Sequence, residues 1–165
     1  MSTLRHAQPA HYAHQRPGKH AGHVYPADPA SVRLARRLVT TVLSEWGLAV
    51  LADDGGLIAD ELAANAVRQS IMAAGVTAEI LVHVSRTERH VTIQVGDNNP
   101  AAPPRPPRRV PGCAESGRGL MISAALAEQL GWFREADWKI VWAALAVPRQ
   151  RHARHASREQ LRPAA

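Results

Sequence analysis

The segment from Ala59 to Ser70, which reads ADELAANAVRQS, constrains the fold of this chain more than any other segment. On a helix, Glu61, Asn65 and Arg68 recur at i, i+4 and i+7, and they therefore line one stripe. Apolar residues flank this stripe on both sides: Ile58, Leu62, Val67 and Ile71. Because a solvated surface helix is apolar on one side only, the pattern predicts a largely buried helix whose polar stripe faces a cavity. A carboxylate and a carboxamide one turn apart suit a base and a metal ligand, whereas a buried Glu–Arg pair on a core helix explains the stripe equally well.

Length and composition limit what surrounds this helix. A chain of 165 residues, 45% of them hydrophobic, allows one domain with a real core. No apolar run reaches the roughly 18 residues that a membrane span needs, and the first residues lack the apolar segment of a secretory signal. We therefore expect a cytoplasmic protein that does not enter a membrane. The single cysteine, Cys113, excludes an internal disulfide and is compatible with that compartment.

The formal charge of +6 is concentrated at the two ends. Residues 1–27 contain basic but no acidic side chains, and the arginines of residues 148–165 outnumber the single acid there. The body between them is close to neutral, whereas a domain that grips nucleic acid usually carries its basic patch on the fold itself. We therefore do not expect direct nucleic-acid binding. Attraction of the two basic ends to an acidic partner protein is the simpler use of this charge.

The two ends also lack apolar periodicity. Residues 1–27 are rich in His, Pro and Ala, and their histidines are spaced too irregularly to indicate a metal site, so we expect a disordered arm. Residues 148–165 form an Arg-rich tail, either a frayed helix or disordered. One domain is predicted between the arm and the tail, over residues 28–147.

Helix signals open this domain. Asp28 and Pro29 suit the N-cap and the first position of a helix, and Gly47 suits the position just after its end. A second helix is predicted to begin at Asp53–Asp54, to carry the polar stripe, and to stop near Gly75.

After this helix, the apolar residues no longer recur with the period of a helix but at every second position. Apolar residues alternate over residues 80–85 and again over residues 91–95, with a turn at residues 87–89, which predicts an antiparallel hairpin with one face toward the helices. His83 lies on this hairpin, and nothing near it in sequence would tune it as a catalyst, so we expect a packed or half-exposed strand residue. Asp97 ends the second strand.

A Pro-rich stretch follows Asp97 and continues to residue 117. It cannot form a helix or a central strand, and loops of this length are usually lids or linkers. A third helix is predicted from Gly119 to Gly131, and a closing hairpin from residues 132–135 and 139–147.

Two polar features border the Pro-rich stretch. The turn Gly117–Arg118–Gly119 stands immediately before a helix, where backbone N–H groups and an arginine can hold an anion, although a flexible turn explains it equally well. Asp97, at the other border, can accept a hydrogen bond from an exocyclic amine such as that of adenine, or it can cap the following turn.

Taken in their order along the chain, these motifs resemble a known family, although no single motif is specific enough to do so. A helix with E-L-x-x-N-A, a strand-end Asp with a following Pro, and G-R-G-L before a helix resemble the ATP-binding domain shared by DNA gyrase, sensor histidine kinases and mismatch-repair ATPases. Within that superfamily, residues 28–147 are most similar to the anti-sigma regulatory factors, which are serine/threonine kinases. The resemblance implies an α/β (α+β) two-layer sandwich of the Bergerat type, with a mixed, mostly antiparallel sheet and helices on one face.

The same resemblance implies roles for residues at matching positions. Asn65 would coordinate Mg²⁺ between the phosphates of ATP, and Glu61 would act as the general base. Asp97 would recognise the adenine amino group. The turn Gly117–Arg118–Gly119 would close on the triphosphate, and Lys139 would lie near the nucleotide.

The chain also departs from the superfamily pattern. The sequence Asp97-Asn98-Asn99-Pro100 lacks both glycines of the usual D-x-G-x-G motif, so the nucleotide would be held more loosely at that edge. Gln69 stands where many relatives have a histidine. No phosphoacceptor-histidine domain is present in the sequence, which argues against a sensor histidine kinase.

Two functions remain open at this point. One is Mg-ATP-dependent serine/threonine phosphorylation of a protein partner, with an anti-sigma antagonist as substrate and a sigma factor as the regulated partner, both by resemblance. The alternative is a catalytically silent, nucleotide-gated protein-binding module. Both need the same pocket, so the sequence does not separate them. Either protein could form a homodimer through an exposed sheet edge.

Overall fold

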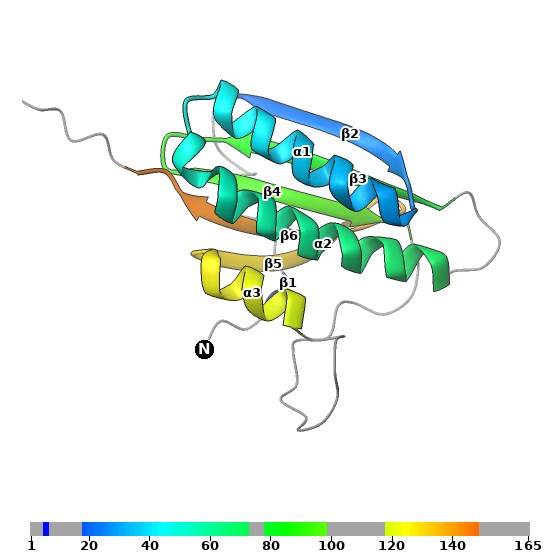
Figure 1. Ribbon diagram of the computed structural model, residues 1–165. Helices are drawn as coiled ribbons and strands as arrows, with labels where there is room; N and C mark the ends of the chain where they lie inside the picture. The colour runs from blue at the N-terminus through cyan, green and yellow to red at the C-terminus, as the bar shows by residue number, and fades with distance from the viewer. Residues whose placement is uncertain (1–4, 7–17, 73–77, 99–117, 149–165) are drawn as a thin grey trace, which may run out of the picture.

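The computed structural model describes residues 5–6, 18–72, 78–98 and 118–148. Helices and strands form two layers, with the helices α1, α2 and α3 on one face of a single sheet (Figure 1). This is the predicted α+β sandwich. Within the described residues, no helix combines the length and the apolarity needed to cross a bilayer.

In the described part of the chain the sheet has six strands, and every neighbouring pair is antiparallel except one. The exception is the two-residue strand β1, which runs parallel to β5 at one edge, so the sheet is mixed and mostly antiparallel as predicted. The spatial order of the strands is β1 (Arg5–His6), β5 (Gln129–Glu135), β6 (Trp138–Ala146), β4 (His90–Asp97), β3 (Glu79–Arg86) and β2 (His20–Pro26). Both predicted hairpins, β3–β4 and β5–β6, are confirmed.

The strand β2 was not predicted, because the sequence placed it in a disordered arm over residues 1–27. That prediction is wrong for His20–Pro26, which pairs with β3 along its whole length. Ala21 and Tyr25 pack against the core, whereas most of the other side chains of the strand are exposed. An edge strand of this kind buries so little that its apolar alternation is too weak to read from the sequence.

Local capping sets the bounds of α1 (Pro29–Glu45), as the sequence predicts. The carboxylate of Asp28 accepts a hydrogen bond from the backbone N–H of Ser31 at 3.0 Å. At the other end Trp46 is the C-cap, and Gly47 has φ of 72°, a backbone conformation that glycine adopts without strain.

The long helix α2 (Ala52–Met72) follows α1 after a short 3₁₀ turn, η1 (Ala49–Leu51). It begins one residue before the predicted start, and its predicted end near Gly75 lies outside the described residues. Gly55 allows α1 and α2 to approach closely, since a Cβ there would lie 2.6 Å from the side chain of Leu43.

The helix α3 (Arg118–Leu126) is shorter than predicted. The sequence placed its end at Gly131, but Gln129 and Leu130 already belong to β5. The N–H of Glu128 donates to the carbonyl of Ala144 at 2.9 Å, so the backbone has joined the sheet by this point. Leu130 still reaches the core from the strand, which explains why its apolar side chain looked helical in the sequence.

The main core lies between the sheet and the helices. Its strand residues are every second residue of β3, β4 and β6, and they pack against the inner faces of α1 and α2. A smaller apolar cluster lies on the opposite face of the sheet and consists of Phe133, Ile140, Trp142 and Ala144, with Trp138 packed against it.

Candidate functional site

The polar stripe of α2 is only partly buried. Glu61 and Asn65 are half-buried and Arg68 is exposed. No ion pair joins Glu61 to Arg68 in the described part of the chain, so a buried Glu–Arg pair does not explain the stripe. The apolar flanks are uneven, because Val67 is buried whereas Ile71 is 59% exposed. The helix is therefore buried on one flank of the stripe and open at its C-terminal end.

Asp97 and Lys139 form an ion pair inside the protein. Each side chain is 1% exposed, and the Nζ of Lys139 lies 3.2 Å from Oδ1 of Asp97. The two residues are directly opposed in the register of β4 and β6, on the face that carries Val141 and Ala143. Either charge alone would be costly to bury, so each residue depends on the other. The structure thus brings together two residues for which the resemblance implied a shared ligand.

The C-terminal half of α2, which carries Asn65, extends toward the same end of the sheet as this pair. Ser70 Oγ donates to the carbonyl of Glu79 at 3.4 Å, and the next residue of β3, Ile80, is opposed to Asp97. Figure 1 shows the same relation, with the C-terminal end of α2 and the arrowhead of β4 pointing in one direction.

The N-terminal end of α3 points to this end as well. The helix ends at Leu126 and Glu128 lies beside Ala144, near the far end of β6, so the N-terminal end of α3 is directed toward the end where β6 begins (Figure 1). Arg118 and Gly119 are its first two residues, and Gly117 lies outside the described residues. The first N–H groups of a helix have no partner within the helix and can hold an anion.

The Asp97–Lys139 pair thus lies at one end of the sheet, and the C-terminal end of α2 and the N-terminal end of α3 are both directed toward that end. The helix α2 packs against both β4 and α3. Among the described residues, no group of three His, Cys, Asp or Glu side chains could hold a metal. A divalent ion here would rely on ligand phosphates and on an oxygen donor such as the Asn65 carboxamide.

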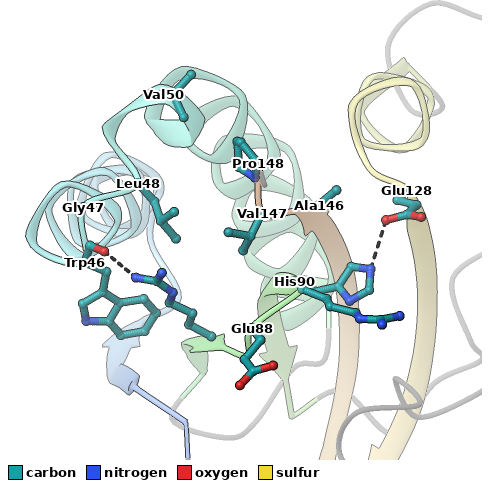
Figure 2. A pocket seen from close by; sticks show the side chains of 12 residues that line it. Trp46, Gly47, Leu48, Val50, Glu88, His90, Glu128, Ala146, Val147 and Pro148 are labelled. Carbon is teal, nitrogen blue, oxygen red and sulfur yellow. Dashed lines mark hydrogen bonds and ion pairs between the residues drawn. The ribbon is translucent and has the colours of Figure 1, made fainter. Parts of the chain in front are cut away.

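A hollow of about 670 Å³ lies at the opposite end of the sheet, and the sequence did not predict it. Figure 2 shows Trp46 and Val50 on one side, and His90 and Glu128 on the other. His90 Nε2 lies 3.0 Å from Oε2 of Glu128, and Arg86 donates to the carbonyl of Trp46. These residues come from separate segments of the chain that only the folded structure brings together, so no sequence motif could have revealed the hollow.

His83 is a packed strand residue, as predicted. It is half-buried, and its ring stacks on that of His20 with 6.2 Å between the ring centroids. Burial lowers the pKa of His83 below its usual value, because the charged imidazolium loses water there. The residue lies on the face of the sheet opposite the helices, away from the candidate site.

The α+β sandwich, with an open and mostly antiparallel sheet and helices on one face, is consistent with a Bergerat-like ATPase fold. The sequence profile of the histidine kinase-like ATPase domain family matches residues 25–145, and the chain belongs to this family. ATP binding follows from that membership. No curated protein matches the chain.

Proposed function

We propose that this protein is a regulatory kinase of the anti-sigma type, which uses Mg-ATP to phosphorylate a serine or threonine of a protein partner. The observation that supports the proposal is the buried Asp97–Lys139 pair at one end of the sheet, toward which the C-terminal end of α2 and the N-terminal end of α3 are both directed. The family match supports the nucleotide, and the resemblance to anti-sigma factors supports the reaction and the partners.

In this proposal each residue has one task. Asp97 accepts a hydrogen bond from the adenine amino group, and Lys139 holds that carboxylate in place. The segment Gly117–Arg118–Gly119, whose last two residues begin α3, holds the phosphates through the first N–H groups of the helix. Asn65 contributes an oxygen ligand to Mg²⁺, which supplies charge neutralisation between the phosphates when it is bound.

The transfer step needs a base. The hydroxyl oxygen of the partner attacks the γ-phosphorus while the bond to the ADP oxygen breaks, and the hydroxyl proton passes to the carboxylate of Glu61. Glu61 is half-buried on the polar stripe of α2, one turn from Asn65. Positioning and electrostatics would supply most of the rate, as in other phosphoryl transfers.

Two variants test this division of tasks. Asn65→Ala should abolish the Mg²⁺-dependent part of ATP binding in a calorimetric titration with and without Mg²⁺. Glu61→Ala should keep ATP binding but stop transfer of labelled phosphate to the partner. Retained phosphorylation in Glu61→Ala would refute its role as base, and the absence of any heat with ATP in the unmodified protein would refute the whole proposal.

One observation favours the silent module instead. Within the described residues, no hydrogen bond or ion pair orients the Glu61 carboxylate, whereas catalytic bases are usually held by a neighbour. In that case ATP would bias a partner-binding surface without being consumed. Incubation with labelled ATP and candidate sigma factors and antagonists, followed by a search for phosphoserine and phosphothreonine, separates the two functions.

A further inference from the structure

Lys139 occupies a position that the fold would normally give to an apolar residue. It lies on the same face of β6 as Val141, Ala143 and Leu145, all of which are buried in the main core. It is the largest of the fully buried side chains in the described part of the chain. Lysine is almost never buried so completely unless it is paired.

Stability alone does not explain this pair. A buried ion pair often contributes no more than two apolar side chains of similar volume, because both charges must leave water. Asp97 and Lys139 also lie at the end of their strands, where an apolar pair would extend the row that the strands already carry. The pair therefore points to a requirement for charge at this place.

The chemistry of purines shows what that charge could decide. An ionised carboxylate only accepts hydrogen bonds, whereas a protonated one also donates. A 6-amino purine such as adenine presents a donor at the position where a 6-oxo purine such as hypoxanthine presents an acceptor. The charge of Asp97 therefore determines which of these two groups it can bind at position 6 of the base.

We propose that Lys139 is a positioning residue that keeps Asp97 ionised and thereby makes the site select 6-amino over 6-oxo purine nucleotides. This inference rests on the proposed function, since it assumes that Asp97 contacts the base. The opposed register of β4 and β6 holds the two side chains against each other. On the other face of the sheet, a Cβ on Gly96 would lie 3.2 Å from the Trp138 ring, so β4 and β6 are also packed together there.

Few other charges surround the pair in the described structure. Arg134 on β5 is opposed to Lys139 and is exposed, and Glu79 on β3 precedes Ile80, which is opposed to Asp97. The helix α2 contributes Glu61, which is half-buried, and Arg68, which is exposed. Within the described residues, Lys139 is a buried cation that forms an ion pair with Asp97 inside the protein.

The test compares ATP with inosine triphosphate, which differs from ATP in the base edge. Affinities are measured by calorimetry for the unmodified protein, for Lys139→Met, which removes the charge and keeps the length, and for Lys139→Arg, which keeps the charge. Lys19→Met is the matched control, because Lys19 is the only other lysine of the chain and is exposed. Circular dichroism establishes that each variant folds.

We expect a preference for ATP over inosine triphosphate of at least about tenfold in the unmodified protein, in Lys139→Arg and in Lys19→Met. The ratio of the two affinities should stay constant from about pH 5 to pH 9. In Lys139→Met the ratio should fall toward one at neutral pH, because Asp97 takes up a proton. Raising the pH should restore the preference as that proton is lost. A structural role of Lys139 alone would not produce this dependence on pH.

Other outcomes would overturn the inference. A folded Lys139→Met that keeps the full preference for ATP at neutral pH would do so, and so would an unmodified protein that loses its preference as the pH falls below about 6. If Lys139→Met does not fold, Lys139→Gln replaces it, since glutamine keeps a donor to Asp97 without the charge. Absence of ATP binding by the unmodified protein would instead refute the proposed function.

Discussion

The two ends of the sheet carry similar side chains in very different settings. At the end where β4 finishes, Asp97 and Lys139 are each 1% exposed and pair across two strands. At the end where β4 begins, His90 and Glu128 pair with exposures of 20% and 55% around an open hollow. Water screens the charges of the second pair and is excluded from the first. A similar distance between the charged atoms therefore corresponds to a stronger electrostatic interaction in the first pair.

The difference teaches where a charged pair carries information about function. A surface pair forms with little loss of free energy and can be lost with little effect on stability, so its presence indicates little about function. A buried pair requires that both charges leave water and that both residues remain, so it persists where the charge itself is needed. The comparison therefore favours the Asp97 end as the ligand site, although the hollow lies at the other end.

The largest effect is expected from Asp97→Ala. This change leaves the Lys139 charge buried without a partner, and we expect the free energy of unfolding to fall by about 3–5 kcal/mol in urea denaturation. In the double variant Asp97→Asn with Lys139→Met, the free energy of unfolding should fall by less than in Asp97→Ala, because neither residue of the pair then carries a charge. A loss below about 1 kcal/mol for Asp97→Ala would mean that the pair is far better solvated than its exposure indicates.

A much smaller effect is expected from Glu128→Gln. The side chain is more than half exposed, so removal of its charge should lower the free energy of unfolding by under about 1 kcal/mol, and added salt should reduce the difference further. Urea denaturation at low and high salt measures both quantities. A loss as large as that of Asp97→Ala would remove the contrast between the two ends.

The smallest effect is expected between the ends, at His83. Because burial lowers its pKa, the unfolded chain binds a proton more readily than the folded chain does, so His83 should reduce stability as the pH falls below its unfolded value of about 6.5. His83→Gln should make the stability curve flatter in that range. Denaturation of both proteins between pH 7 and about pH 5 checks this, and parallel curves would contradict it.

The features that the sequence predicted are those fixed by nearby residues. Asp28 and Gly47 set the bounds of α1 through their own backbone and side-chain chemistry, and two-residue alternation over long runs revealed both hairpins. The motifs around Asn65 and Asp97 were visible because they stand in a fixed order along the chain. The structure was needed to show that α2, which carries Asn65, extends toward the end of the sheet where Asp97 lies.

The features that were missed depend on distant residues. The strand β2 is held by pairing with β3 rather than by its own composition, and α3 ends early because Glu128 joins β6. The hollow around Trp46 and His90 is built from segments that are adjacent only in the folded structure. The Asp97–Lys139 contact likewise follows from strand register, which a single sequence does not encode locally.

The contact of Trp138 with Gly96 has a practical consequence. Its indole packs beside the residue that precedes Asp97, whereas Trp46 lines the hollow at the opposite end. Each end of the sheet thus contains its own intrinsic fluorophore. A ligand that binds near Asp97 should alter the emission of Trp138 and leave that of Trp46 unchanged, and replacing either indole by phenylalanine would assign the signal without any added dye.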